Sequence, residues 1–461
     1  MEPITIGQVA YITGGTLMSG NANFEIDSIS TDSRTASVGS LFIPLRGERF
    51  DGHEFIHDAV RKRRIGAFLT EKSIGYVDES EVAVIKVPDT LKALHKLATY
   101  NRKRLDIPVI AITGSTGKTT TKDMVYSVLC TKYNTLATEG NLNNEIGLPL
   151  TLLRLNNSHE IAVVELGMNA LGEIHALANI SLPDVAIITN IGVSHIGKLK
   201  SRDNIFKAKM EIFDYFHDNC IAILNGDDPY LRKVEDDFRF PILYIGTENS
   251  YLRAYDIEEN HNDGISYYVD TGGTSHRIEL SIPGVHNVYN SMFAIAVGLL
   301  YEVDMEDIKQ ALHSFKPGGA RLNIFNTDEG IKVIDDVYNA NPASVEASLS
   351  VLGAMESRRK VAVLGEMLEL GSYSKNAHTE IGRLAVQEGV EILVTLGDDA
   401  RYMAVGAYEA GLDNSNIKSF SCNKDVIQYL DTIVSAGDTI LVKGSRGMQM
   451  EDIVDYLRER R

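Results

Sequence analysis

The stretch that decides the fold is VIAITGSTGKTTTKDMV, residues 109–125. A β-branched run ends at Thr113, a glycine-rich turn follows, and a helical pattern comes after the turn. Glycines let a backbone approach an anion closely, and the N–H groups and dipole of a helix N-terminus attract negative charge. The stretch therefore predicts a strand, a phosphate-binding loop and a helix, in that order.

The loop is an incomplete match to the common phosphate-loop pattern G-x-x-x-x-G-K-[ST], because Ile112 stands where that pattern has glycine. This departure disfavours a generic motor or GTPase. We expect Lys118 to reach the β- and γ-phosphates and the Thr119 hydroxyl to ligate Mg²⁺. The alternative is a turn that merely precedes a helix carrying an exposed lysine. The candidate nucleotide-binding residues are Gly114, Ser115, Thr116, Gly117, Lys118, Thr119 and Thr120.

Outward from the loop, the chain repeats a strand, loop and helix rhythm. Apolar, β-branched runs occur at 109–113, 161–167, 184–192, 220–226, 332–338, 360–366, 391–397 and 439–444. Such near-continuous runs are typical of strands covered on both faces. Helical patterns lie between them, for example at 120–130 and 289–303. The alternation predicts α/β architecture with mostly parallel sheets.

Two interruptions divide the chain. Residues 247–282 indicate β-hairpins, and the Pro/Gly-rich segment 315–323 precedes a restart of the α/β rhythm. We expect three domains. They are a small N-terminal α/β domain (1–86), a central P-loop-type domain with a mostly parallel sheet (87–316), and a C-terminal Rossmann-like α/β domain (317–461).

Composition narrows the function classes. The 461 residues carry a formal net charge of -18, which argues against a nucleic-acid partner. No apolar stretch reaches the roughly 20 residues that span a bilayer, and the first residues do not resemble a signal peptide. Three scattered cysteines form neither a disulfide framework nor a zinc motif. We expect a cytoplasmic protein with no membrane insertion.

Two further candidates follow strands. Glu165 ends the run 161–167, so its carboxylate reaches the carboxyl edge of the sheet, where open α/β sheets bind ligands. The alternative is an ordinary strand-end glutamate. His195 comes just past the next run, although a lone histidine is more often structural than catalytic.

TGSTGKTT (113–120) resembles the phosphate loop of the Mur ligases, ATP-dependent amide-forming enzymes of peptidoglycan precursor synthesis. Other segments are similar to family segments and occur in the same order. They are STDSR (30–34), LFIPLRG (41–47), FDGHEF (50–55), TEGNLNNEIGLPLTLL (138–153), VVELGMNALGEI, ITNIGVSHIG, KAKMEIF, LNGDDP, GVHNVYNSMFAIA, GGARL, DDVYNANPASVEASL, LGEMLELG and KGSRGMQME. NANP (339–342) and LGEMLELG (364–371) are similar to the branch that uses D-alanyl-D-alanine. The sibling that adds the third, diamino residue has D-N-P-R, whereas Ala343 follows Pro342 here.

The resemblance implies a reaction and its partners. The substrates would be ATP with Mg²⁺, a UDP-N-acetylmuramoyl-tripeptide and D-Ala-D-Ala. Separately, three mobile domains lead us to expect a monomer. A carboxylate attacks the γ-phosphorus to give an acyl phosphate and ADP, and an amine then displaces phosphate. Two unit charges ~4 Å apart repel by about 4 kcal/mol at an effective dielectric near 20. Lys118 and Mg²⁺ would oppose that repulsion.

The resemblance also implies roles near the nucleotide. Thr119, Glu165 and His195 would contact the metal site. His195 would contact either a second metal ion or the phosphate. Asn287 and Asn290 would contact the adenine side. Arg321 and Asp336 would reach phosphate and ribose from the third domain, unless they form a helix cap or an interdomain ion pair.

Lys209 is implied to be carbamylated by CO₂, which turns a cation into an anion that helps to position Mg²⁺. That chemistry needs a neutral amine, and hence a dry or electropositive site. The alternative is a charged Lys209 paired with Glu211 or another acid. Lys207 serves as the comparison, because we expect it to be solvated.

Substrate residues complete the implied site. Asp32, Ser33 and Arg34 would hold the sugar nucleotide, unless they form only a turn with a surface arginine. Neutral amides suit a polar glycopeptide, and the candidates are Asn141, Asn143 and Asn144. Asn339 and Asn341 would meet the dipeptide, whose carboxylate Lys443 or Arg446 would attract. A hinge at 316–319 would let the third domain close and exclude water.

Three rival functions are disfavoured. A folylpolyglutamate synthetase-like ligase shares the central and C-terminal plan but not the motifs at 30–55. A P-loop kinase or motor ATPase conflicts with Ile112 and with the lack of a basic polymer track. A non-catalytic nucleotide-binding scaffold is disfavoured because every expected charged position is filled.

Overall fold

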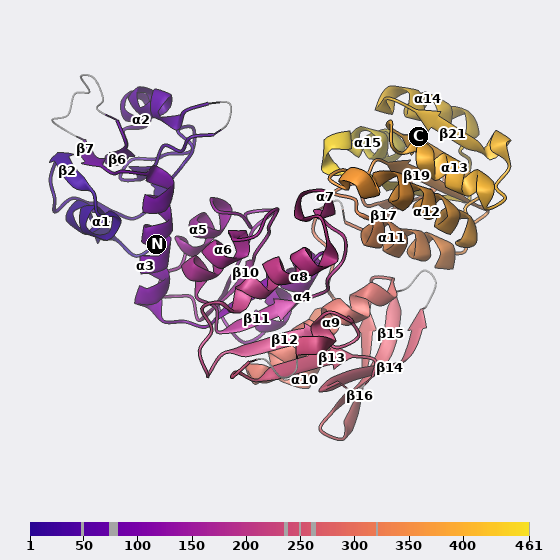
Figure 1. The fold of residues 1–461 in the computed structure, drawn as a ribbon, viewed down its shortest axis with the longest axis horizontal. Coiled ribbons are helices and arrows are strands. Elements are labelled where there is room, and N and C mark those ends of the chain that lie inside the picture. The colour runs from indigo at the N-terminus through magenta and orange to yellow at the C-terminus, as the bar shows by residue number, and fades with distance from the viewer. Residues whose placement is uncertain are drawn as a thin grey trace.

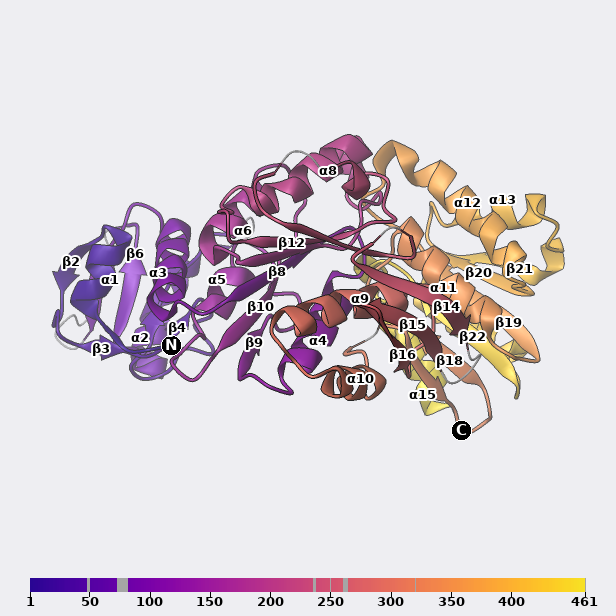
Figure 2. The ribbon, with the colours of Figure 1, turned by 90° about the horizontal axis from the view of Figure 1, so that it is seen from below.

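The structure, a computed structural model, describes residues 1–47, 50–72, 82–234, 238–248, 250–259, 264–319 and 321–460. Three bodies lie in a row (Figures 1 and 2), with the N-terminal body at one end, the C-terminal body at the other and the middle body between them. Each body has its own main sheet. The predicted three-part α/β class is confirmed.

The N-terminal body is a small α/β unit. Its sheet has the order β2 (Thr16–Ser19), β7 (Ala83–Lys86), β6 (Ala67–Thr70), β5 (Leu41–Phe42), β4 (Ile29–Ser30). A short pair, β1 (Ile4–Thr5) with β3 (Glu25–Ile26), lies beside it. The helices are α1 (Ile6–Thr13), η1 (Gly52–Phe55) and α2 (Ile56–Arg63). Helix α3 (Thr90–Leu105) then leads into the middle body and contacts both α1 and α5 (Gly147–Leu152).

The middle sheet has the order β16-β15-β14-β13-β12-β11-β8-β10-β9. Its parallel part contains β8 (Val109–Thr113), β9 (Thr135–Ala137), β10 (Ile161–Glu165), β11 (Val185–Ile188), β12 (Ile221–Asn225) and β13 (Ile242–Gly246). Strand β14 (Leu252–Glu259) joins in parallel and continues antiparallel into β15 (Ile265–Thr271) and β16 (Thr274–Leu280). These last strands confirm the predicted hairpin region, of which residues 249 and 260–263 lie outside the described residues.

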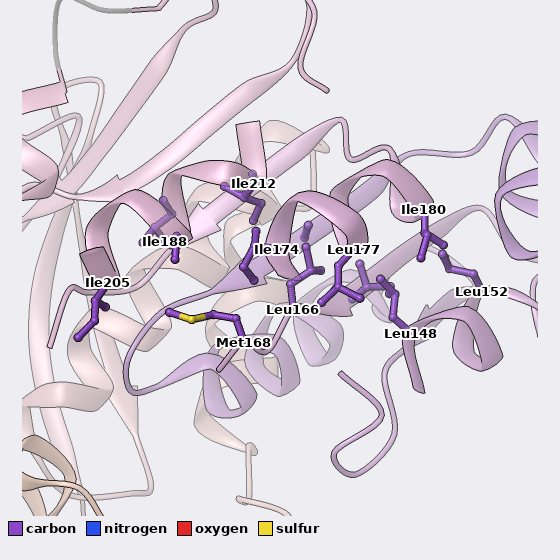
Figure 3. Packing of buried hydrophobic residues seen from close by; sticks show 14 of the residues in the cluster. Leu148, Leu152, Leu166, Met168, Ile174, Leu177, Ile180, Ile188, Ile205 and Ile212 are labelled. Atoms are coloured by element: carbon purple, nitrogen blue, oxygen red, sulfur yellow. The ribbon is translucent and has the colours of Figure 1, made fainter. Parts of the chain in front are cut away.

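Helices cover both faces of the middle sheet. One face carries α5, α6 (Glu173–Ser181), α8 (Arg202–Met210) and η2 (Glu211–Phe213), whose apolar side chains interlock in Figure 3. The other carries α4 (Lys118–Leu129), α9 (Val285–Leu300) and α10 (Met305–His313). Val109 and Ala111 pack on the first side, and Ile110 and Ile112 on the second. This two-sided burial is why the strand sequence is continuously apolar. Short α7 (Ile196–Leu199) and η3 (Leu231–Val234) complete the body.

The C-terminal sheet has the order β17 (Asn323–Asn326), β18 (Lys332–Asp335), β22 (Asp438–Lys443), β19 (Arg359–Gly365), β20 (Ile392–Leu396), β21 (Ile417–Phe420). All neighbours are parallel except β17 with β18. The covering helices are α11 (Pro342–Ala354), α12 (Ser374–Gln387), α13 (Arg401–Glu409), α14 (Asn423–Ile433) and α15 (Glu451–Glu459), with η4 (Gly371–Tyr373), η5 (Asn414–Asn416) and η6 (Arg446–Met448) in the loops.

The predicted domain limits after residues 86 and 316 both fall between sheets. Ala320, part of the quoted GGARL segment, lies outside the described residues. Cys130, Cys220 and Cys422 are free thiols. Over the described part of the chain, every helix is too short or too polar to cross a bilayer.

Candidate functional site

The glycine turn fits only glycine at two positions. A Cβ on Gly114, whose φ is +153°, would lie 1.8 Å from Thr189 Oγ1. A Cβ on Gly117, whose φ is +78°, would lie 2.6 Å from Asn290 Oδ1. Ile112, by contrast, is a fully buried residue of β8 that fills the core. The departure from the common motif is therefore explained by packing.

The next strand holds the turn in place. The Thr189 hydroxyl donates to Thr116 O at 2.5 Å, and the amide of Thr116 donates to Asn190 Oδ1 at 3.1 Å. The amide of Ser115 donates to Asn190 O at 3.0 Å. Sequence reasoning missed Thr189 and Asn190 as site residues, although their place just after β11 at the carboxyl edge was a signal for them.

Lys118 is the first residue of α4, and its Nζ donates to Gly114 O at 2.9 Å. Burial lowers the pKa of Lys118, and the charge of Arg321 lowers it further, while Glu165 raises it. A triphosphate placed here would supply negative charge and raise that pKa again. An anionic ligand at this position would therefore stabilise Lys118 as a cation.

Glu165 ends β10 and is buried. Its Oε2 accepts from the Thr119 hydroxyl at 2.6 Å and its Oε1 from Asn143 Nδ2 at 2.8 Å. A carboxylate and a hydroxyl are hard oxygen ligands that fit Mg²⁺. Over the described residues, no three His, Cys, Asp or Glu side chains gather into a metal-binding group, and Mg²⁺ commonly completes its shell with water and phosphate oxygens. Asn143, predicted to hold glycopeptide, contacts Glu165 here.

His195 caps the N-terminus of α7 with a left-handed backbone, φ +61°. Its Nδ1 lies 2.6 Å from Oε2 of Glu369, a residue of the C-terminal body. Burial lowers the pKa of His195. The carboxylate of Glu369 acts in the opposite direction and raises it. Glu369 was not anticipated from the sequence, because 174 positions in the chain separate the two residues.

Lys209, on α8, is 2% exposed. Burial holds its pKa well below the usual lysine value, and the positive charge of Lys118 lowers it further. The alternative pairing with Glu211 is not observed, because that carboxylate accepts from the amides of Gly172 and His175. Lys207 is exposed, as expected.

The predicted adenine-side amides are engaged with the protein. Asn287 Nδ2 donates to Pro283 O at 2.7 Å, and Asn290 Nδ2 donates to Asn287 Oδ1 at 3.1 Å. The Thr121 hydroxyl donates to Asn290 Oδ1 at 3.1 Å. These bonds fix the start of α9 against α4.

Arg321 and Asp336 come from the C-terminal body. The guanidinium of Arg321 lies 3.8 Å from the centre of the Tyr338 ring, a cation–π stack. Asp336 accepts from the Ser348 hydroxyl at 2.6 Å and forms an ion pair with Lys443. Lys443, predicted to attract a dipeptide carboxylate, is therefore neutralised by Asp336 in this arrangement.

One cavity of about 520 Å³ brings most candidates together. It is lined from both the middle and the C-terminal bodies by Ser115, Thr116, Gly117, Lys118, Thr119, Thr120, Asn141, Asn143, Asn144, Glu165, His195, Asn287, Asn290, Arg321, Asp336, Asn339, Asn341 and Lys443. Gly114 and Lys209 are not among its lining residues. The lining also includes His286, which sequence reasoning missed and whose pKa burial lowers to about 4.

The remaining candidates lie elsewhere. Arg446 is paired with Glu451 and does not line the cavity, so the structure does not bring it to the site. Asp32, Ser33 and Arg34 belong to the N-terminal body, away from this cavity. Arg34 Nη2 lies 2.7 Å from Asp32 Oδ2, and Arg34's side chain is 84% exposed. The hydrogen bond from Arg34 lowers the pKa of Asp32 to about 2.

Comparisons with known proteins agree along the chain. Residues 25–102 match the Mur ligase family catalytic domain, residues 112–298 the Mur ligase middle domain, and residues 320–446 the Mur ligase glutamate ligase domain. The sequence is 39% identical to the UDP-N-acetylmuramoyl-tripeptide–D-alanyl-D-alanine ligase of Bacillus subtilis (strain 168), over 99% of this chain and 98% of the relative.

Solved structures of Mur ligases also match this chain. MurF from Acinetobacter baumannii superposes with a TM-score of 0.91 at 34% identity, covering 100% of both chains. MurF ligase from Thermotoga maritima in complex with ADP gives 0.82 at 28% identity, covering 94% of this chain and 97% of that one. The chain belongs to the Mur ligase family.

Proposed function

We propose that this chain is an ATP-dependent ligase that joins D-alanyl-D-alanine to UDP-N-acetylmuramoyl-tripeptide through an acyl phosphate. The observation that carries the proposal is the shared cavity, where the lysine-tipped loop of the middle body faces residues of the C-terminal body. The name of the B. subtilis relative supports the choice of substrates. The ADP complex of the T. maritima relative supports a nucleotide in this cavity.

The phosphate loop would hold the triphosphate. The backbone amides of Gly117, Lys118, Thr119 and Thr120 lie at the start of α4, and the helix dipole adds positive potential there. Lys118 would move from Gly114 O to the β- and γ-phosphates. Asn287 and Asn290 would shape the adenine end, because they fix the wall formed by α9.

The first chemical step joins a peptide carboxylate to the γ-phosphorus. An O–P bond forms, the bond from the γ-phosphorus to ADP breaks, and ADP leaves with the electron pair. Lys118 and Arg321 would offset the repulsion between the two anions, which is about 4 kcal/mol at ~4 Å and an effective dielectric near 20. Thr119 and Glu165, with His195 nearby, would hold Mg²⁺, which supplies further positive charge.

In the second step the dipeptide amine attacks the acyl carbon. A C–N bond forms, the C–O bond breaks with its electron pair going to phosphate, and the proton lost by the amine would pass to the departing phosphate. Asn339 and Asn341 would position the dipeptide from the C-terminal body. Closure about residues 316–319 would keep water from the acyl phosphate, which would otherwise hydrolyse.

Lys209 fits carbamylation, because a buried amine with a lowered pKa and no acidic partner among the described residues is available as a nucleophile for CO₂. The carbamate would then lie as an anion near Lys118. The N-terminal body, with Asp32, Ser33 and Arg34, would hold the UDP part of the precursor.

We also expect the protein to act in the cytoplasm as a monomer. ATP is the driving substrate, and free thiols such as Cys220 persist in a reducing compartment. Sedimentation at working concentrations checks the monomer, since a heavier species would contradict it.

Phosphate release in a matrix of substrates tests the function. We expect release only when ATP, UDP-tripeptide and D-Ala-D-Ala are all present. Release with ATP alone would indicate a motor-type ATPase, and none under any condition would indicate a scaffold. Acceptance of a folate glutamate acceptor in place of UDP-tripeptide would indicate the folylpolyglutamate-type reaction.

A further inference from the structure

We propose that Glu369 is a positioning residue that holds the His195 imidazole at the cavity, and that it does so only while the C-terminal body is docked on α7. The proposal rests on the proposed function, because it assigns His195 a part in the ligase site. Glu369 itself does not line the cavity. It would therefore act through His195 and not through the substrates.

Two contacts join Glu369 to the α7 segment. Its Oε2 lies 2.6 Å from His195 Nδ1, and its carbonyl accepts from the Gly197 amide at 3.0 Å. The first contact is close but not aligned as a hydrogen bond, since Nδ1 has no well-directed partner among the described residues. In Figure 1, α7 lies at the boundary between the middle and C-terminal bodies.

The α7 segment and the loop that carries Glu369 approach each other closely at two glycines. A Cβ on Gly197 would lie 2.5 Å from Glu369 O, and one on Gly371 would lie 3.1 Å from Gly197 Cα. His195 and Glu369 both have left-handed backbones, with φ of +61° and +65°. Non-glycine residues rarely adopt this conformation unless the surroundings fix it. Both partners of the contact are therefore held in specific orientations.

The loop that carries Glu369 is fixed to the C-terminal wall of the cavity. The Leu368 amide donates to Ser445 Oγ at 2.8 Å, and the Ser445 hydroxyl donates to Ala340 O at 3.3 Å. The Met367 amide donates to His378 Nε2 at 3.0 Å. Ala340 lies between two cavity-lining asparagines. A movement of this wall would therefore carry Glu369 with it.

The chemistry of imidazole gives the contact a consequence. A carboxylate next to Nδ1 favours the tautomer with hydrogen on Nδ1, which leaves Nε2 as an acceptor. Nε2 of His195 makes no hydrogen bond to the described residues, so it is the nitrogen available to a ligand in the cavity. Undocking of the C-terminal body would release both the ring orientation and the tautomer preference.

Kinetics and NMR test the proposal in the full-length protein with ATP, UDP-tripeptide and D-Ala-D-Ala. Glu369→Ala should lower kcat by about 10- to 100-fold, a range common for residues that orient a functional histidine. The KM for UDP-tripeptide should not change. Glu369→Gln should fall between Glu369→Ala and wild type, and Asp398→Ala, which removes an exposed carboxylate of the same body, should match wild type.

Long-range ¹H–¹⁵N spectra supply a readout that does not depend on activity. The His195 signal, assigned by its loss in His195→Ala, should report the Nδ1–H tautomer in wild type and a shift away from it in Glu369→Ala. The Glu369 side chain is 45% exposed, so its removal leaves no buried hole, and Glu369→Gln carries the same test should Glu369→Ala fold poorly. Unchanged kcat, or the same tautomer signal in wild type and variants, would overturn the proposal. Failure of the proposed function is distinct, because wild type itself would then release no phosphate.

Discussion

Gly114→Ala should damage ATP binding, and the structure sets the size of the effect. The new Cβ would lie 1.8 Å from Thr189 Oγ1 and 3.0 Å from Thr189 Cβ. The Thr189 hydroxyl would have to leave Thr116 O, which it now reaches at 2.5 Å. Losing that hydrogen bond costs about 1 kcal/mol. The backbone at φ +153° is one that L side chains rarely adopt, which adds on the order of 1–3 kcal/mol.

The two terms together give about 2–4 kcal/mol. If the loop rearranges to relieve the strain, the Kd for a non-hydrolysable ATP analogue should rise by about 30- to 700-fold, at 1.4 kcal/mol per tenfold change. If the loop keeps its shape, the same free energy should appear as a lower melting temperature. Calorimetric titration and thermal melting measure the two alternatives.

Gly272→Ala is the matched control. Gly272 also has a positive φ, +63°, but nothing lies within 4 Å of the added Cβ, and it sits at the β15–β16 turn. We expect this variant to bind the analogue as wild type does. Binding of UDP-tripeptide should be unchanged in both variants. The reasoning is refuted if Gly114→Ala binds the ATP analogue as tightly as wild type does and also melts at the same temperature.

Three further predictions concern Lys118, Glu165 and Lys209. Lys118→Ala should reduce phosphate release by at least about 100-fold while UDP-tripeptide binding, measured by titration, stays nearly intact; loss of that binding would contradict the separation of the two sites. Glu165→Gln should raise the Mg²⁺ concentration needed for half-maximal rate, because an amide group replaces an oxygen that now accepts from Thr119 or Asn143; an unchanged Mg²⁺ titration would argue against Glu165 as a ligand. Lys209→Met should stabilise the protein at neutral pH. The folded pKa of Lys209 is lowered, so below the unfolded value near 10.4 the unfolded chain binds more protons and wild-type stability rises with pH toward that value. The advantage of the methionine variant in urea unfolding should shrink as pH rises, and bicarbonate should stabilise wild type only. A pH-independent difference would refute the burial argument.

The sequence predicts the middle and C-terminal sheets well because their strands are buried on both faces. Ile110 and Ile112 pack on one side of β8 and Val109 and Ala111 on the other, so the apolar run is visible without any tertiary information. Short elements are different. Helix α7 has only four residues, too few to show a periodic pattern, and it contacts the C-terminal body through the Gly197 amide.

The same distinction applies to the site. Residues at a strand end, such as Glu165, are predictable because the carboxyl edge of a parallel sheet is a known ligand position. The partners of those residues are not. Asn143 reaches Glu165, and Glu369 reaches His195, only through the tertiary arrangement of separate segments. The side chain of Arg446 pairs with Glu451, a contact that its place in the motif does not predict.

The central claim is that a peptide carboxylate captures the γ-phosphorus beside Lys118 and Glu165. The most direct measurement uses UDP-tripeptide with ¹⁸O in its terminal carboxyl group, and mass spectrometry of the phosphate released with ATP and D-Ala-D-Ala. Because phosphate leaves with the carboxylate oxygen, the account predicts one ¹⁸O in the inorganic phosphate. Phosphate without ¹⁸O would contradict it, since the oxygen would then have come from water.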